Sequence, residues 1–264
     1  MNVFKFSPLL LPFVFPLHAH AGETEWAIQA LALHQHVEEI GRTGNILVEE
    51  SGLEPAAELV ARWIASENTL SGKMLFGSST LDYEGRTQSG VPIDSETDYR
   101  RLRATLGYSR VMTDTTKLSI QFETEWLSRD IQGIGTISGL QEDTRSSRLL
   151  FGVEKRVGGV GRPIRLDLAA VVGVSGTQTI SAPGIIDDVD LPEGSTLGAR
   201  VAANLPLGES DGRGLAWSLA PTVEYLHSER SEDRPWFQNG VLRGTLAQPE
   251  TRRWAAGVGL VASW

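Results

Sequence analysis

The sequence predicts an all-β fold, a transmembrane antiparallel up-and-down β-barrel of about ten strands. Three observations predict it. Many segments alternate apolar and polar residues at period two, aromatic residues fall at the ends of these segments, and no apolar run after residue 21 reaches the roughly 18 residues of a transmembrane helix. A membrane-spanning barrel strand does not need such an apolar run, because only alternate residues face lipid. Barrels of eight or twelve strands stay open as alternatives.

The first 21 residues predict a cleaved secretory signal peptide. Lys5 precedes an apolar run over 9–17, which is too short to span a membrane, and Ala19-His20-Ala21 supplies the small-residue cleavage pattern. We therefore expect a signal peptide over 1–21 and a barrel domain over 22–264. The chain has no cysteine, which excludes both a lipid-modified Cys and disulfides.

The first strand starts near Trp26, and its pattern is mixed. Ile28 and Ala30 favour one phase of the alternation, whereas Leu31 and Leu33 favour the other. A β-bulge or a short helix in the barrel mouth stays open here, and residues 41–53 could form an extra hairpin.

The remaining strands divide the chain at regular intervals. The clearest lie at 117–126, 164–175 and 197–205, where the charges occupy one face only, and weaker ones lie at 58–65, 70–83, 99–111, 148–157 and 215–227. Short connections near 67–68, 112–115, 158–162 and 209–214 alternate with long ones near 84–97, 132–143, 177–194 and 228–250. An even strand number leaves both termini and the short turns in the periplasm, and the long loops outside.

The last twelve residues form the most informative strand. One face carries Trp254, Ala256, Val258, Leu260, Ala262 and Trp264, and the other carries Arg253 with small residues. This strand resembles the C-terminal strand of Gram-negative outer-membrane β-barrels, whose last residue is typically aromatic and is read by the barrel-assembly machinery. The resemblance implies an outer-membrane location and an assembly signal at Val258, Leu260, Ala262 and Trp264. The expected partners are outer-membrane lipid, lipopolysaccharide and the assembly machinery.

Aromatic residues test this topology, because a membrane barrel carries them at both interfaces. Trp26, Trp63, Tyr108, Trp217 and Trp264 fall at the expected periplasmic ends, and Trp126, Tyr225 and Trp254 fall at the outer ends. A soluble secreted barrel or sandwich would also alternate, with its apolar face turned inward. The aromatic placement, the terminal Trp and a polar face rich in Gly and Ala favour the membrane barrel.

The polar faces place many charges inside the barrel. Such charges must be paired or hydrated, and barrels of about eight strands are just filled by side chains, whereas open channels appear at 16 to 18 strands. The sequence therefore predicts a salt-bridged plug with trapped water, and a narrow solute path is the alternative. The predicted lumen charge network comprises Arg62, Lys73, Arg101, Arg103, Lys117, Glu123, Glu125, Arg129, Arg148, Glu154, Arg165, Asp167, Arg200, Glu224 and Arg253.

Acidic residues collect in the predicted outer loops, and the whole chain carries a formal charge of −9, which argues against a nucleic-acid partner. Solvated loop charge is the default interpretation. The alternative is a divalent cation bridging these carboxylates to lipopolysaccharide phosphates. The residues concerned are Asp82, Glu84, Asp94, Glu96, Asp98, Glu142, Asp143, Asp187, Asp188, Asp190 and Glu193.

Candidate catalytic groups are few. His34, His36 and Glu38 share one strand face and could form a base with its orienting carboxylate or bind a metal. His227 and Ser228 point to opposite faces of a strand, so His227 cannot activate Ser228 directly. Size and strand number resemble those of the omptin proteases, but the chain has no Asp-x-His sequence, so the resemblance stops at architecture.

The sequence thus predicts a non-enzymatic outer-membrane barrel with a structural or surface-interaction role and no cofactor. A narrow solute pore is the first alternative. A surface-located hydrolase, either an omptin-like protease or a lipid hydrolase, is the second. The surface ligand is not indicated.

Overall fold

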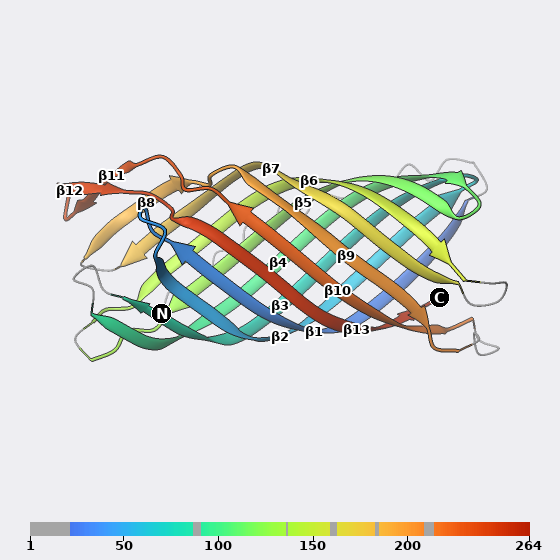
Figure 1. The fold of residues 1–264 in the computed structure, drawn as a ribbon, viewed down its shortest axis with the longest axis horizontal. Helices are drawn as coiled ribbons and strands as arrows, with labels where there is room; N and C mark the ends of the chain where they lie inside the picture. The colour runs from blue at the N-terminus through green and yellow to red at the C-terminus, as the bar shows by residue number, and fades with distance from the viewer. Residues whose placement is uncertain (1–21, 87–90, 136, 159–162, 183–184, 209–213) are drawn as a thin grey trace.

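The computed structural model describes residues 22–86, 91–135, 137–158, 163–182, 185–208 and 214–264, and the predicted signal peptide at 1–21 lies outside them. The described residues form a closed antiparallel barrel of ten strands, seen from the side in Figure 1. No helix suited to crossing a membrane occurs in this part of the chain. The strands are β1 (Glu23–Ile40), β2 (Ile46–Ala65), β3 (Asn68–Arg86), β4 (Pro92–Thr113), β5 (Thr116–Ile131), β6 (Leu140–Val157), β7 (Ile164–Ala182), β8 (Ile186–Pro192), β9 (Thr196–Pro206), β10 (Ala216–Ser228), β11 (Arg234–Gln238), β12 (Val241–Leu246) and β13 (Glu250–Ser263).

Neighbours in sequence are neighbours in the wall, as expected of an up-and-down barrel. β1 through β7 pair in order, β7 pairs with β9, and β9 pairs with β10. β10 pairs with β13, and β13 closes the barrel on β1 through fourteen register positions, from Ala27↔Ser263 to Ile40↔Glu250. The first wall strand, β1, begins at the same end of the barrel at which the last wall strand, β13, ends. We call this the turn end, and the opposite end the loop end.

The apolar face of each strand points outward, so the alternative of a soluble barrel or sandwich is wrong. On β5, Leu118, Ile120 and Phe122 are exposed. Glu123 and Glu125, which lie nearer the loop end on the same strand, are buried in the lumen. β7 repeats this pattern, with Leu166 and Leu168 exposed. We call the outward-facing apolar surface between the two aromatic rows the apolar belt.

The aromatic rows set the height of the apolar belt. Trp26, Trp63, Tyr108, Trp217 and Trp264 lie outward at the turn end, and Trp126, Tyr225 and Trp254 lie outward toward the loop end. On β13 the two rows are ten residues apart, from Trp254 to Trp264. Ten residues rise about 33 Å along a strand, which is about 25 Å of height at the usual tilt of about 40°. This matches the apolar band of outer-membrane barrels.

β1 resolves the mixed pattern of the first strand. It is a single uninterrupted strand, neither bulged within 26–38 nor helical, in which Ile28 and Ala30 face outward while Leu33 and Val37 are buried in the lumen. The lumen face of β1 carries apolar Leu33 and Val37 as well as polar Gln35, so apolar residues occur in both phases of the alternation. Residues 41–53 do not form an extra hairpin, because Gly41 to Asn45 make the turn from β1 to β2 and the rest belongs to β2.

The strands rise far above the apolar belt at the loop end, and this corrects the predicted long loops. β3 and β4 pair through Arg86↔Pro92, so 84–86 and 92–97 are strand, and β5 and β6 pair through Ile131↔Leu140, so 140–143 is strand as well. The outward-facing residues there are polar, so the alternation of apolar and polar residues is lost and the sequence predicted loops. β8 pairs with the upper part of β7, above the start of β9.

Residues 229–249 connect β10 to β13 and carry the β11–β12 hairpin, which projects beyond the barrel in Figure 1. Asp233 accepts a hydrogen bond from Arg42 at 2.6 Å and another from Arg230, and these bonds lower the pKa of its carboxyl. Asp187 accepts the backbone N–H groups of Asn239 and Gly240 at 3.0 and 2.9 Å. These contacts tie the hairpin connection to the β1–β2 turn and to β8.

We predict that Ile120→Arg, a charge placed in the middle of the apolar belt, lowers the free energy of unfolding in lipid vesicles by about 2–4 kcal/mol. Urea titration followed by Trp fluorescence measures this. Gln141→Arg, on the outward face above the belt, is the matched control and is expected to change stability by less than about 0.5 kcal/mol. Equal effects at the two positions would contradict the outward orientation.

Candidate functional site

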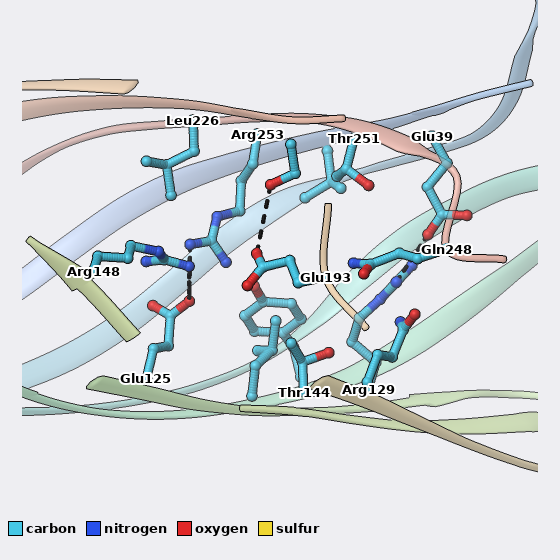
Figure 2. A pocket seen from close by; sticks show the side chains of 15 residues that line it. Glu39, Glu125, Arg129, Thr144, Arg148, Glu193, Leu226, Gln248, Thr251 and Arg253 are labelled. Atoms are coloured by element: carbon cyan, nitrogen blue, oxygen red, sulfur yellow. Dashed lines mark hydrogen bonds and ion pairs between the residues drawn. The ribbon is translucent and has the colours of Figure 1, made fainter. Parts of the chain in front are cut away.

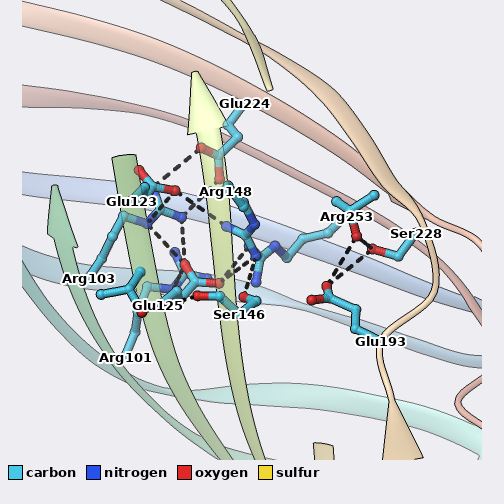
Figure 3. Close-up of polar contacts among 12 residues, drawn as sticks. Arg101, Arg103, Glu123, Glu125, Ser146, Arg148, Glu193, Glu224, Ser228 and Arg253 are labelled. Atoms are coloured by element: carbon cyan, nitrogen blue, oxygen red, sulfur yellow. Dashed lines mark hydrogen bonds and ion pairs between the residues drawn. The ribbon is translucent and has the colours of Figure 1, made fainter. Parts of the chain in front are cut away.

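Charged side chains from six strands meet in the middle of the lumen (Figure 3). Strand alternation places every second residue inward, so β4 and β5 each contribute two charges and β6, β9, β10 and β13 contribute one each. We call this set, with Glu54 of β2, the midbarrel network. Its members are Arg101, Arg103, Arg148, Arg200 and Arg253, and Glu54, Glu123, Glu125 and Glu224.

Glu125 is the centre of the midbarrel network. Its carboxylate lies 2.7 Å from Arg103, 2.8 Å from Arg253, 3.1 Å from Arg148 and 3.6 Å from Arg101. Because these arginines come from β4, β6 and β13, one side chain joins three parts of the wall. Figure 3 shows the guanidinium groups converging on it.

Glu123 and Glu224 form the second centre. Arg200 donates to Glu123 at 2.9 Å and also to Glu224, and Arg103 donates to Glu224 at 3.0 Å. Arg148 lies 3.4 Å from Glu123 and so connects the two centres. The ion pairs therefore form a continuous lattice across the barrel.

Most of this lattice is buried. Glu123 is 0% exposed and Glu125 2%, with Arg101 and Arg148 at 4%. Charges at such depth are tolerated only with close partners and hydrogen bonds, which the nine members supply to one another. The midbarrel network is therefore a dense group of paired charges inside the lumen.

Glu54 and Gln35 extend the midbarrel network toward β1 and β2. Gln35 donates to Glu54 at 2.6 Å, and Arg101 lies 3.2 Å from the same carboxylate. A β-carbon at position 77 would collide with the Glu54 carboxylate, so Gly77 makes room for this side chain. Glu54 and Gln35 were not among the predicted lumen residues, because 54–57 was assigned to no strand and the alternation of the first strand was mixed.

A second cluster lies above the apolar belt and holds three carboxylates around one guanidinium. Arg129 lies 2.6 Å from Glu142, 2.9 Å from Glu39 and 2.9 Å from Glu50. We call these four residues the upper cluster. Glu39, Glu50 and Glu142 were not predicted members of the lumen network, because 132–143 was expected to be loop and β1 had no assigned phase.

The upper cluster has more carboxylates than guanidinium groups, and this excess of negative charge raises pKa values there. Burial, together with the charges of Glu39 and Glu50, raises the pKa of Glu142 to about 7 against the opposing effect of Arg129. Burial and Glu39 also raise the pKa of Tyr83 to about 12. Glu142 therefore changes its charge near neutral pH.

A cavity of about 70 Å³ separates the upper cluster from the midbarrel network (Figure 2). Its lining includes Arg129 from above, Arg148 and Arg253 from below, and Glu193 from the connection after β8. A water needs about 10–15 Å³ by this measure, so the cavity has room for several waters but not for a peptide or a sugar ring.

Six predicted network residues lie nearer the turn end and do not join the midbarrel network. Arg62 lies 3.7 Å from Glu25, and Glu154 lies 3.9 Å from Arg156. Ion pairs within 4 Å are not found for the other four among the residues the structure describes. The six are Arg62, Lys73, Lys117, Glu154, Arg165 and Asp167, whereas the other nine predicted residues lie in the midbarrel network or, for Arg129, in the upper cluster.

The histidines of the described chain lie on the outer wall. His34 and His36 face outward beside Trp254, with ring centroids 5.9 and 5.4 Å away. His36 lies 3.4 Å from Glu38 and 3.7 Å from Glu49. In the described ranges, no hydroxyl is hydrogen-bonded to a histidine and no three metal-ligating side chains converge.

His227 and Ser228 do point to opposite sides of β10. His227 lies 3.8 Å from Glu250 on the outside, whereas Ser228 is buried and hydrogen-bonded to Thr196 at 2.8 Å. Thus neither set of histidines meets a nucleophile in the lumen.

The acidic residues expected in outer loops lie mostly on the outward faces of extended strands. Asp82 is opposite Glu96, and Glu84 is opposite Asp94, on β3 and β4. Glu142 and Glu193 are the exceptions, because Glu142 faces the lumen and Glu193 lines the lumen cavity.

Comparison with known proteins bears on the fold. No protein-family profile matches the chain, and no curated protein matches its sequence. The matching solved structures are Gram-negative outer-membrane β-barrels.

Three of these structures illustrate the range. The outer-membrane protease OmpT of Escherichia coli has a TM-score of 0.56 at 7% identity and covers 94% of this chain and 99% of its own. The translocator domain of the autotransporter NalP from Neisseria meningitidis has a TM-score of 0.49 at 11% identity, covering 92% and 89%. The Pseudomonas putida toluene transporter TodX has a TM-score of 0.40 at 11% identity, covering 93% and 89%. At such identity, the likeness to OmpT establishes the architecture alone.

We predict that Glu125→Gln lowers the free energy of unfolding by about 3–5 kcal/mol, because it leaves buried arginines without their shared carboxylate. Urea unfolding in lipid vesicles measures this. The control is Glu67→Gln, which removes an exposed partner of Arg110 and should cost no more than about 1 kcal/mol. A cost for Glu125→Gln as small as that of the control would show that the network does not support the fold.

We also predict that stability falls as pH rises between about 4.5 and 7. The pKa of Glu142 is higher in the folded chain, about 7, than its ordinary value of 4.5, so the folded state binds more protons in this window and loses stability as they leave. Glu142→Gln should therefore unfold at a higher temperature than the native chain at pH 8 and show no such advantage at pH 5. Thermal unfolding at both pH values, with exposed Glu232→Gln as control, measures this, and equal pH profiles would refute the assignment.

Proposed function

We propose that this chain is an outer-membrane barrel with a structural or surface-interaction role, whose lumen is plugged by ion pairs. The single observation that carries the proposal is the burial of the midbarrel network in the lumen, with Glu123 and Glu125 at 0% and 2% exposure. A lumen closed in this way leaves the outer wall and the loop end as the surfaces available for interaction.

Several features support the outer-membrane location. The apolar belt has the height of a hydrocarbon layer and is framed by two aromatic rows. β13 ends beside Trp264, and Val258 and Leu260 are exposed on its outward face, where we propose that the assembly machinery reads them. Ala262 of the same signal also faces outward but is buried, between Ile28 and Trp217 in the register. The proposal further includes export by the signal peptide at 1–21.

The loop end supports a surface role. Most wall strands continue above the apolar belt with polar outward faces, and the β11–β12 hairpin carries exposed Phe237, Val241 and Leu242 beyond the wall. Exposed side chains of this kind on a rigid scaffold are typical of binding surfaces. The proposal assigns no catalytic step, because the described histidines face away from the lumen and lack a hydroxyl partner.

Planar-bilayer recording tests the plug. We expect the native barrel to give no steady ion current. Replacing Arg103, Arg200, Glu123 and Glu224 together by Ala removes two positive and two negative charges. The net charge of the midbarrel network is therefore unchanged, while the lumen loses four large side chains. This variant should conduct steadily.

The matched control is Lys73→Ala with Asp167→Ala, a balanced pair of predicted lumen residues outside the midbarrel network, which should stay silent. Heat-dependent migration on gels verifies that each variant is folded. A steady current through the native barrel would refute the plug and favour the pore alternative.

A further inference from the structure

Two arginines on the outer wall stand just above the aromatic row of the loop end and lack an acidic partner. Arg100 of β4 and Arg145 of β6 both face outward and are exposed. Within the described residues, neither guanidinium lies within 4 Å of a carboxylate, although ion pairs of this kind are recorded for most other arginines. Unpaired cations at one level of a membrane barrel call for an explanation.

The register places Arg100 on one side of β5 and Arg145 on the other side, opposite positions that are two residues apart. Arg100 is directly opposite Ser128 on one side, and Arg145 is directly opposite Trp126 on the other. Two strand spacings and a two-residue offset put their Cα atoms about 12 Å apart. The side chains can therefore converge over Ser128, whose hydroxyl adds a hydrogen-bond donor between them.

Trp126 fixes the level of this pair. It belongs to the loop-side aromatic row, with Phe122 and Ile120 of the apolar belt below it on the same strand. The Arg145 guanidinium lies 5.5 Å from the Trp126 ring centroid, in cation–π geometry. Aromatic rows of this kind lie at the level of lipid headgroups, so Arg100, Ser128 and Arg145 stand where headgroup phosphates lie.

Elsewhere on the outer wall, basic residues that face outward have acidic neighbours. On the β13 side of the barrel, Arg252 pairs with Glu250 at 3.2 Å and His36 lies between Glu38 and Glu49. The positive charge of Arg252 is therefore paired within the protein itself. On β4 to β6, Asp98 and Asp130 are opposite each other two residues above Arg100 and Ser128, and Asp143 is directly opposite Ser128, two residues above Arg145.

We propose that Arg100, Ser128 and Arg145 bind the phosphate of an anionic lipid headgroup in the outer leaflet. This rests on the proposed outer-membrane location. Two guanidinium groups supply planar, charge-assisted donors suited to phosphate, and the acyl chains of the same lipid lie along Phe122 and Ile120. Asp98, Asp130 and Asp143 border these three residues on the side of the loop end, so they disfavour a bound phosphate at higher positions and keep it at the headgroup level.

Native mass spectrometry of the purified full-length barrel in detergent tests this. The probe is bis-phosphorylated lipid A, compared with its dephosphorylated form and with inorganic phosphate. The native chain should retain the phosphorylated lipid and not the dephosphorylated one. Arg100→Gln and Arg145→Gln should each weaken retention roughly tenfold, because each removes one charge-assisted contact to phosphate.

Arg110→Gln is the matched control, since Arg110 is an exposed outward arginine at the turn end that pairs with Glu67 at 3.6 Å. It should retain lipid A as the native chain does. If a Gln variant fails to fold on a heat-shift gel, Ser128→Asp serves instead, because it places a carboxylate between the two guanidinium groups and should abolish retention.

Retention by the variants equal to that of the native chain would overturn the site. So would equal retention of the dephosphorylated lipid. Displacement of lipid A by inorganic phosphate at the same concentration would show a free-phosphate site and overturn the lipid assignment. These readouts do not depend on conductance, so failure of the plug and failure of this site are distinguishable.

Discussion

The pairing of buried charge is the constraint on which this barrel depends. A closed sheet of ten strands turns half of its side chains into a narrow lumen, and this chain fills the middle of that lumen with five arginines and four glutamates. Glu123, Glu125 and Glu224 each pair with arginines of more than one strand, whereas Arg148 and Arg253 pair only with glutamates of β5. Glu125 alone touches arginines of β4, β6 and β13, so the relative positions of distant strands are fixed by one carboxylate.

The barrel is stratified along its axis as a result. The midbarrel network lies inside the upper edge of the apolar belt, because Glu125, Glu224 and Arg253 are the sequence neighbours of Trp126, Tyr225 and Trp254 in the loop-side aromatic row. Above it, the outward face becomes polar and acidic, and the interior changes to the upper cluster, where three carboxylates share Arg129. The turn end holds looser charges such as Lys73 and Asp167.

Much of this was predictable, because alternation and aromatic placement are local signals. The period-two pattern of 164–175 and the outward Trp at each end of β13 were sufficient for the fold, and eight of the predicted lumen charges, from Arg101 to Arg253, lie in the midbarrel network. The upper part of the wall was not predictable in the same way. There Asp82 and Glu84 face outward into water, so polar residues occupy both faces and the alternation vanishes. Glu50 and Glu142 were missed for that reason, and β1 was ambiguous because Leu33 and Val37 pack inside while Ile28 faces out.

Arg253 lies on the last strand of the chain, whereas its ion-pair partner Glu125 lies on β5. The seam between β13 and β1 closes the barrel, and β13 brings the fourth arginine to Glu125. A seam slipped by a single residue would turn Arg253 toward hydrocarbon and leave Glu125 with three arginines instead of four. Correct alignment of the closing seam and completion of the ion pairs around Glu125 therefore depend on each other.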